Sequence, residues 1–205
     1  LLLICNPNNP TGTRLAPETI LDLAASAPQT LVVVDELYEA FTGDSVLPIA
    51  DFSATPNLLV FRSLSKTAGL AALRIGFAIG HPGVIDRVGR VTGPYEVNSV
   101  AVAAAFAALA DQSYVDAYVA EVLRARDWTV EALRSAGIRH HCDGGNYLLV
   151  WPEKPVAEVD AALRGEGILI RSMAGKALID GCFRVSLGTT SQMQRFMEAF
   201  LRLDQ

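Results

Sequence analysis

Short apolar runs bounded by turn residues constrain the fold of this chain more than any other feature. They lie at residues 1–5, 31–34, 58–61 and 75–79, and each is continuous rather than alternating. Continuous runs of this length are typical of strands that are covered on both faces. We therefore expect central strands of a mostly parallel sheet, with the first run forming a buried strand.

A predicted helix separates the first two runs. Within residues 16–27, Ile20, Leu21 and Leu23 lie on one helical face, and Pro17 suits the first turn of a helix. Strand, helix, strand is the crossover unit of a parallel sheet. Two more helices are expected at 83–91 and 97–110, and the alanine content of the second favours close packing.

A change of pattern near residues 111–113 predicts a domain boundary. A long helical pattern occupies residues 114–136. After it, strands are expected at 138–141, 147–151, 168–171 and 183–187, and helices at 156–164 and 191–203. The sequence therefore predicts an α/β chain of two domains, a mostly parallel sheet with its helices over residues 1–112 and a smaller α+β domain over residues 113–205.

Composition excludes several classes of protein. The net charge is −5 and no run of Lys or Arg is long, so no nucleic-acid partner is expected. Three scattered cysteines form no disulfide framework, which favours the reducing cytoplasm, and neither they nor the three histidines have the spacing of metal ligands. The apolar start of five residues is too short for a signal peptide or a membrane span, so no membrane partner is expected.

Two polar clusters follow the first two apolar runs, where an open α/β sheet places its ligand site. The first is NPNNPTG at residues 6–12, in which two prolines hold the backbone so that the amide of Asn9 can meet a ligand; a tight polar turn is the alternative. The second is DELY at residues 35–38. The carboxylate of Asp35 at the end of a buried strand calls for a cationic partner, and Tyr38 can face the same cavity; capping of the next helix is the alternative.

Two further clusters carry basic residues. In SLSKTAG at residues 63–69, Lys66 is a candidate for imine chemistry, and the nearby hydroxyls together with Arg74 suit a phosphate; a solvated loop lysine is the alternative. In FRVSLG at residues 183–188, Arg184 interrupts a predicted core strand and favours a carboxylate partner, as does Arg171 at another strand end. Either arginine can instead belong to a structural ion pair.

In this order, the motifs NPNNPTG, DELY, SLSKTAGLAALRIG and FRVSLG resemble those of fold-type I aminotransferases that use pyridoxal 5′-phosphate (PLP), and within them the histidinol-phosphate aminotransferases. The resemblance runs through essentially all 205 residues. It implies that residues 1–112 are the C-terminal part of the PLP-binding large domain and that residues 113–205 are the small C-terminal domain.

The resemblance also implies roles for the candidate cofactor residues. Lys66 is expected to bond covalently to PLP and later to move the proton between the substrate Cα and the cofactor. Asp35 is expected to pair with the protonated ring nitrogen, while Asn9 and Tyr38 bind the phenolic oxygen. The residues expected to hold the cofactor phosphate are Ser63, Ser65 and Arg74.

Substrate contacts follow from the same resemblance. Arg184 is expected to bind the substrate carboxylate or an anionic group placed similarly, Arg171 to help bind a substrate phosphate, and Tyr95 to lie in a loop near the active site. The implied reaction is a ping-pong exchange between a small-molecule amino donor and a keto-acid acceptor. The family resemblance further implies a homodimer.

The sequence departs from the family pattern at its start. The family has well over a hundred residues before NPNNPTG, which grip the phosphate, stack on the PLP ring and contact substrate, so we expect this chain alone to transaminate inefficiently. A threonine-phosphate decarboxylase or an aromatic aminotransferase shares these motifs and remains an alternative. From another class, a non-catalytic truncated remnant or binding module also remains open.

Overall fold

A computed structural model describes residues 1–204 as two compact units. The first comprises residues 1–9 and 13–118, and the second comprises residues 10–12 and 119–204. Helix α4 (Gln112–Ser135) contributes residues to both units. The assignment of functional domains to residues 1–112 and 113–205 stays a prediction.

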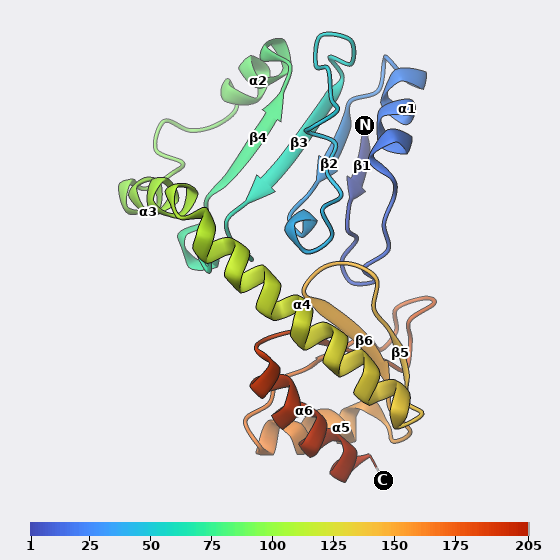
Figure 1. Cartoon of the computed structure of the whole chain (residues 1–205). Helices are drawn as coiled ribbons and strands as arrows, with labels where there is room; N and C mark the ends of the chain where they lie inside the picture. The colour runs from blue at the N-terminus through green and yellow to red at the C-terminus, as the bar shows by residue number, and fades with distance from the viewer. Residues whose placement is uncertain (205) are drawn as a thin grey trace. The chain divides into compact units, whose positions relative to one another are not determined.

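Four strands form the sheet of the first unit, in the order β1-β2-β3-β4 (Figure 1). Their bounds are Leu2–Cys5 for β1, Val32–Asp35 for β2, Leu58–Ser63 for β3 and Gly76–Gly80 for β4. The pairs β1–β2 and β2–β3 are parallel, and β4 is antiparallel to β3. Because β1, β2 and β3 are parallel, their carboxyl ends meet at one edge of the sheet, together with the polar clusters that follow them.

Helix α1 (Pro17–Ser26) forms the predicted crossover between β1 and β2. Its residues Ile20 and Ala24 are fully buried. They pack in one apolar cluster whose sheet residues are Val32, Val34, Leu58 and Val60. The predicted succession of strand, helix and strand is confirmed. Its packing holds β2 and β3 together, the two strands that the DELY and SLSKTAG clusters follow.

Strands β1 and β4 lie at the two edges of this sheet, so the prediction that all four apolar runs form central strands is wrong for the described structure. Leu2 is 37% exposed and Leu3 is 69% exposed, so β1 is not buried as expected. An apolar run shows which side chains favour burial, but it does not show which element covers them.

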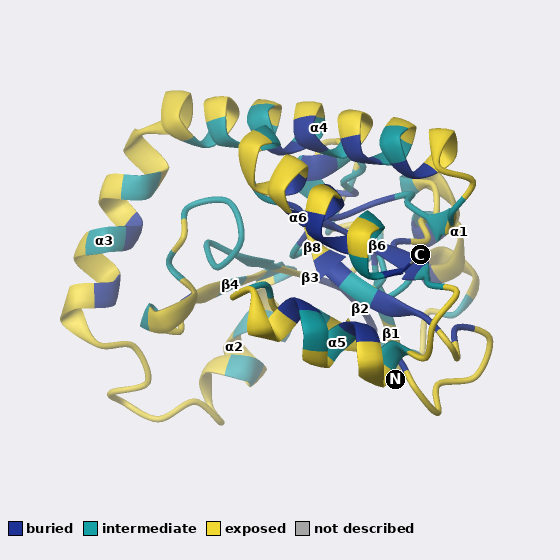
Figure 2. Ribbon diagram, turned by 90° about the horizontal axis from the view of Figure 1, so that it is seen from below, coloured by how far each residue is buried: buried dark blue, intermediate teal, exposed yellow. Residues whose placement is uncertain are grey.

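The remaining helices of the first unit are the 3₁₀ helices η1 (Glu39–Phe41) and η2 (Ala71–Leu73) and the α-helices α2 (Pro82–Gly89) and α3 (Ser99–Ala110). Ala101 and Ala105 of α3 are buried in a cluster with Ile75, as the alanine content of this segment predicts. Figure 2 shows that the rest of α3 is more exposed. This contact fixes the chain directly before β4.

The second unit contains an antiparallel sheet in the order β5-β6-β8-β7. Its elements are β5 (Arg139–His141), β6 (Tyr147–Trp151), α5 (Val156–Gly165), β7 (Arg171–Ser172), β8 (Phe183–Ser186) and α6 (Thr190–Leu203). Phe183 meets Phe196 and Phe200 edge to face, which packs α6 on the sheet.

One predicted strand of the second unit is much shorter than expected. Strand β7 begins only at Arg171, so residues 168–170 lie outside it. The N–H of Ile168 donates to the carbonyl of Leu163, and this residue therefore belongs to the turn that ends α5. None of the helices within residues 1–204 combines the length and the apolar character that crossing a bilayer requires.

Candidate active site

A cavity of about 490 Å³ lies in the first unit, at the carboxyl ends of β2 and β3. Small-molecule sites typically have volumes of roughly 300–1,000 Å³. Five of the predicted site residues line this cavity: Asp35, Ser63, Ser65, Lys66 and Arg74. Residues separated by up to 39 positions in the chain are therefore gathered around one space, as the topology of a parallel sheet predicts.

Asp35 is the last residue of β2 and is half-buried. Its carboxylate accepts a hydrogen bond from the N–H of Leu37 at 3.1 Å. Within residues 1–204, no Lys, Arg or His side chain forms an ion pair with Asp35. A carboxylate in this position is suited to a cationic ligand group, which would compensate its partial desolvation.

Lys66 lies in the segment between β3 and η2. A hydrogen bond of 3.2 Å from the N–H of Leu70 to the carbonyl of Leu64 closes this segment around the lysine. The Nζ atom lies 5.8 Å from the ring centroid of Tyr38, which is 4% exposed. The amine therefore lies between an aromatic ring and the cavity, where a reactive carbonyl group could reach it.

Asn9 and Tyr38 are joined by a hydrogen bond of 3.1 Å from Nδ2 to the phenolic oxygen. The loop that carries Asn9 is anchored by the buried Asn6, whose side chain donates to the carbonyl of Leu15 and accepts from its N–H. Asn6 was not predicted to be a site residue, because nothing in the motif distinguishes this buried asparagine from Asn8 and Asn9. The anchored loop holds Asn9 beside Tyr38.

The residues expected to hold a phosphate form a local group. The hydroxyl oxygens of Ser63 and Ser65 lie 2.8 Å apart, and the N–H of Ser65 donates to Ser63 Oγ at 3.2 Å. Arg74 donates to the carbonyl of Ala71 and has φ of 55°, a left-handed conformation that is uncommon for a residue other than glycine. Two hydroxyls and a guanidinium on one cavity suit an anionic group.

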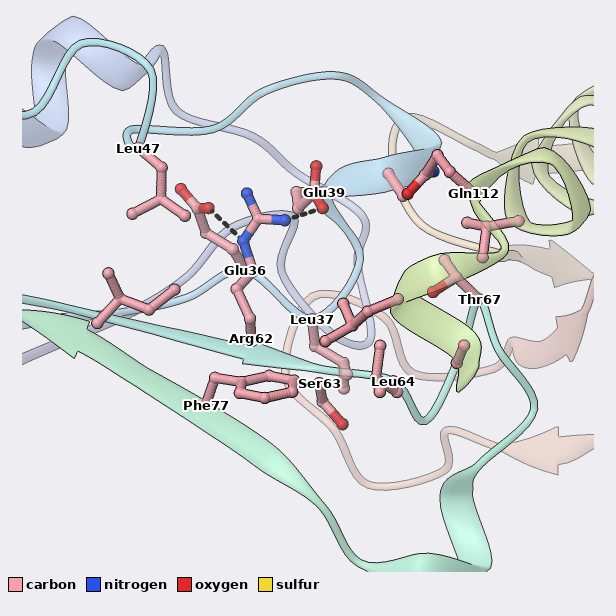
Figure 3. A pocket seen from close by; sticks show the side chains of 15 residues that line it. Glu36, Leu37, Glu39, Leu47, Arg62, Ser63, Leu64, Thr67, Phe77 and Gln112 are labelled. Atoms are coloured by element: carbon pink, nitrogen blue, oxygen red, sulfur yellow. Dashed lines mark hydrogen bonds and ion pairs between the residues drawn. The ribbon is translucent and has the colours of Figure 1, made fainter. Parts of the chain in front are cut away.

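An ion-pair network around one buried glutamate, which the motifs did not predict, lies beside this cavity. It consists of Glu36, Glu39 and Arg62, which line a second cavity of about 370 Å³ (Figure 3). Burial raises the pKa of the Glu39 carboxyl, and the Arg62 guanidinium opposes this shift. Arg62 directly follows the apolar run 58–61, so a charged residue at the end of a core strand was the available signal.

Cys5 also lies close to the site, but its environment opposes nucleophilic chemistry. Burial raises the pKa of the Cys5 thiol, and the Asp35 carboxylate raises it further. A hydrogen bond from the backbone of Asn9 lowers this pKa but does not cancel the increase. Because the thiolate is the reactive form of a cysteine, this shift disfavours Cys5 as a nucleophile at neutral pH. Among the described residues, no group of three or more His, Cys, Asp or Glu side chains is placed to hold a metal ion.

None of the three predicted substrate residues is among those that line the 490 Å³ cavity. Arg171 and Arg184 are opposite each other on β7 and β8 of the second unit, and the Arg184 guanidinium lies 5.3 Å from the ring centroid of Tyr147. Tyr95 is 92% exposed and is not among the residues that line the 490 Å³ cavity. The substrate roles of these three residues stay predictions.

Comparison with known proteins agrees with this geometry. Residues 1–200 match the family model "Aminotransferase class I and II". Histidinol-phosphate aminotransferase 1 of Mannheimia succiniciproducens is 37% identical over 99% of this chain and 56% of its own length. The chain therefore spans little more than half the length of the curated relatives that it matches.

Two solved structures are also similar. The histidinol-phosphate aminotransferase of Sinorhizobium meliloti, in complex with pyridoxal-5′-phosphate, has a TM-score of 0.86 and 26% identity over 98% of this chain and 56% of its own. L-threonine-O-3-phosphate decarboxylase of Porphyromonas gingivalis has a TM-score of 0.85 and 29% identity, covering 98% of this chain and 63% of its own. The predicted α/β fold of fold-type I is confirmed, and the chain belongs to the class I and II aminotransferase family.

Proposed function

We propose that this chain provides the lysine-bearing part of an aminotransferase that uses PLP to transfer an amino group between an amino acid or amino phosphate and a keto acid. The observation that carries the proposal is the cavity that Asp35, Ser63, Ser65, Lys66 and Arg74 share. The donor set fits PLP: an amine for the aldehyde, a carboxylate for the ring nitrogen, and two hydroxyls with a guanidinium for the phosphate.

When bound, PLP supplies an aldehyde that condenses with amines and a ring that takes up electrons from the substrate Cα. Lys66 Nζ would bind the cofactor covalently and would also hold the proton that leaves the substrate Cα. The Asp35 carboxylate keeps a proton on the ring nitrogen, because a nearby anion favours the protonated form. Asn9 and Tyr38, already joined by their hydrogen bond, orient the phenolic oxygen.

The substrate class follows from the two arginines of the second unit. Arg184 and Arg171 lie opposite each other, a pairing that suits a substrate carrying a carboxylate or phosphate. Together with the names of the relatives, this supports a substrate like histidinol phosphate and a place in histidine biosynthesis. We further propose that the protein is a cytoplasmic homodimer and that Tyr95 lies in a loop near the active site. Its two domains are proposed to be residues 1–112 and 113–205.

A single-turnover reaction tests the proposal. The protein is loaded with PLP and mixed with excess histidinol phosphate, and the amino group retained on the cofactor is measured by mass spectrometry. We expect slow conversion by the unmodified chain, which spans little more than half the length of its curated relatives, and none by Lys66→Ala, because no other amine lines the cavity. Equal conversion by the two proteins, or none by either, contradicts the proposal.

Threonine-phosphate decarboxylation is the second candidate, since the Porphyromonas gingivalis decarboxylase is as similar in structure as the aminotransferase from Sinorhizobium meliloti. The two reactions differ in which bond at the substrate Cα is broken. Release of carbon dioxide from threonine phosphate, without transfer of the amino group, would favour the decarboxylase.

A further inference from the structure

The ion-pair network of Glu36, Glu39 and Arg62 has a specific relation to the candidate cofactor site. Each member is the sequence neighbour of a candidate cofactor residue: Glu36 follows Asp35, Glu39 follows Tyr38, and Arg62 precedes Ser63. Asp35 lines the 490 Å³ cavity whereas Glu36 lines the other one, as expected when adjacent residues at a strand end point to opposite faces. Because Glu36 and Glu39 line only the second cavity whereas Arg62 lines both, the network adjoins the residues that would face the cofactor.

Glu36 is the centre of this network. It is 1% exposed, and both of its carboxylate oxygens are engaged. Oε1 accepts from the N–H of Val46 at 2.7 Å, and Oε2 accepts from Ser45 Oγ at 2.9 Å and from Arg62 Nε at 2.9 Å. One buried carboxylate thus ties the end of β2 to β3 and to the loop that carries Ser45 and Val46.

Arg62 uses its whole guanidinium in the network. Nε binds Glu36, one terminal nitrogen binds Glu39, and the other donates to Ser45 Oγ at 2.8 Å. Figure 3 shows the Arg62 side chain between the two glutamates, with an interaction drawn to each. A planar fork of this kind fixes the direction of its partners more strictly than a lysine would.

We propose, resting on the proposed function, that Glu36, Arg62 and Glu39 are positioning residues that hold Asp35, Tyr38 and Ser63 in register for PLP. Among the described residues, the last backbone hydrogen bond between β2 and β3 is the one from the N–H of Glu36 to the carbonyl of Phe61, at 3.0 Å. After Glu36 and Phe61, the two chain segments are joined by the side chains of the network. Loss of Arg62 leaves the buried Glu36 carboxylate without its charged partner, and loss of Glu36 removes the side-chain link between the two strand ends.

The test uses Glu36→Gln and Arg62→Lys, with Asp44→Asn as a matched control. The first variant places an amide donor against Arg62, and the second keeps the charge but not the fork. The control breaks the 2.8 Å ion pair between Arg14 and Asp44. Asp44 directly precedes Ser45 in the same loop but does not belong to the network. Removing outer partners of a metal-binding side chain typically costs roughly 10- to 100-fold in affinity, and we expect the same range for PLP with Glu36→Gln.

Two readouts are needed: the PLP dissociation constant, and the visible circular dichroism per bound cofactor in protein shown to be folded by its far-ultraviolet spectrum. We expect both to change in Glu36→Gln, to change less in Arg62→Lys, and to stay unchanged in Asp44→Asn. If Glu36→Gln fails to fold, Arg62→Lys carries the test. Folded variants with unaltered affinity and dichroism overturn the positioning role alone, whereas an unmodified chain that binds no PLP overturns the proposed function as well.

Discussion

Arg171 and Arg184 occupy directly opposite positions on the antiparallel strands β7 and β8, so two cationic side chains share one face of the second sheet. Like charges directly opposite each other destabilise a strand pair, typically by a few tenths of a kcal/mol to ~1 kcal/mol. An anion bound between them would remove this cost. The pair is therefore a candidate anion site, consistent with a carboxylate or phosphate on the substrate.

Replacement of Arg171 tests that relationship. Arg171→Ser should raise the free energy of unfolding by about 0.5 kcal/mol in a buffer without multivalent anions, because it removes the like-charge contact. Added inorganic phosphate should raise the melting temperature of the unmodified chain more than that of the variant. Loss of stability in the variant, with an equal response to phosphate, would show that the two side chains do not repel each other.

Arg74 is a predicted phosphate ligand, and its backbone conformation is energetically unfavourable. Its φ of 55° is left-handed, where a side chain is disfavoured by roughly 1–2 kcal/mol. Arg74→Gly should therefore raise the free energy of unfolding by about 1 kcal/mol while weakening PLP binding through loss of the guanidinium. Denaturant unfolding and PLP titration measure the two effects.

Arg74→Ala is the matched control for this prediction. It removes the guanidinium but keeps the backbone cost, so it should lose PLP affinity as Arg74→Gly does without the gain in stability. If the two variants have the same free energy of unfolding, the left-handed conformation does not limit the stability of the chain.

Glu121 should make the stability of the protein depend on pH. Hydrogen bonds from the backbone N–H of Thr190, from Arg124 and from the Thr190 hydroxyl lower the pKa of this carboxyl below 4.5. A carboxyl whose pKa is lower in the folded state stabilises the fold above its unfolded pKa, and this contribution is lost as the pH falls through the folded value. The melting temperature should therefore decrease as the pH falls below about 4.5, more than for a chain without this contact.

Glu121→Gln checks the assignment. The variant should melt at a lower temperature than the unmodified chain at neutral pH, and the difference should shrink at acidic pH, because both side chains are then neutral. Calorimetry at a series of pH values measures this. A difference in melting temperature that is constant across the series would rule out the Glu121 carboxylate as its source.

Much of the cofactor site could be predicted from the sequence because it follows strand ends. Asp35, Ser63 and Lys66 each come after an apolar run, and the carboxyl ends of parallel strands meet at one edge. The helix α1 was equally predictable from its proline and its apolar face. These features depend on local pattern and on a general property of parallel sheets.

Other features depend on contacts between distant segments and could not be predicted. The edge position of β1 depends on which element lies beside it, and the role of Glu36 depends on Arg62, 26 residues away. The motif DELY contains Glu36, but no pattern in it distinguishes a side chain that faces a ligand from one that faces a buried arginine. Tyr95 is likewise exposed, which nothing in the sequence around it indicates.

Reductive trapping of PLP on the protein tests whether Lys66 is the amine that binds the cofactor. The chain contains three lysines, Lys66, Lys154 and Lys176, so two of them serve as internal controls. After incubation with PLP, reduction with borohydride and peptide mass mapping, we expect the label on the peptide that contains Lys66 and its loss in Lys66→Ala. A label on Lys154 or Lys176 in place of Lys66, or no label on any peptide, would contradict this expectation.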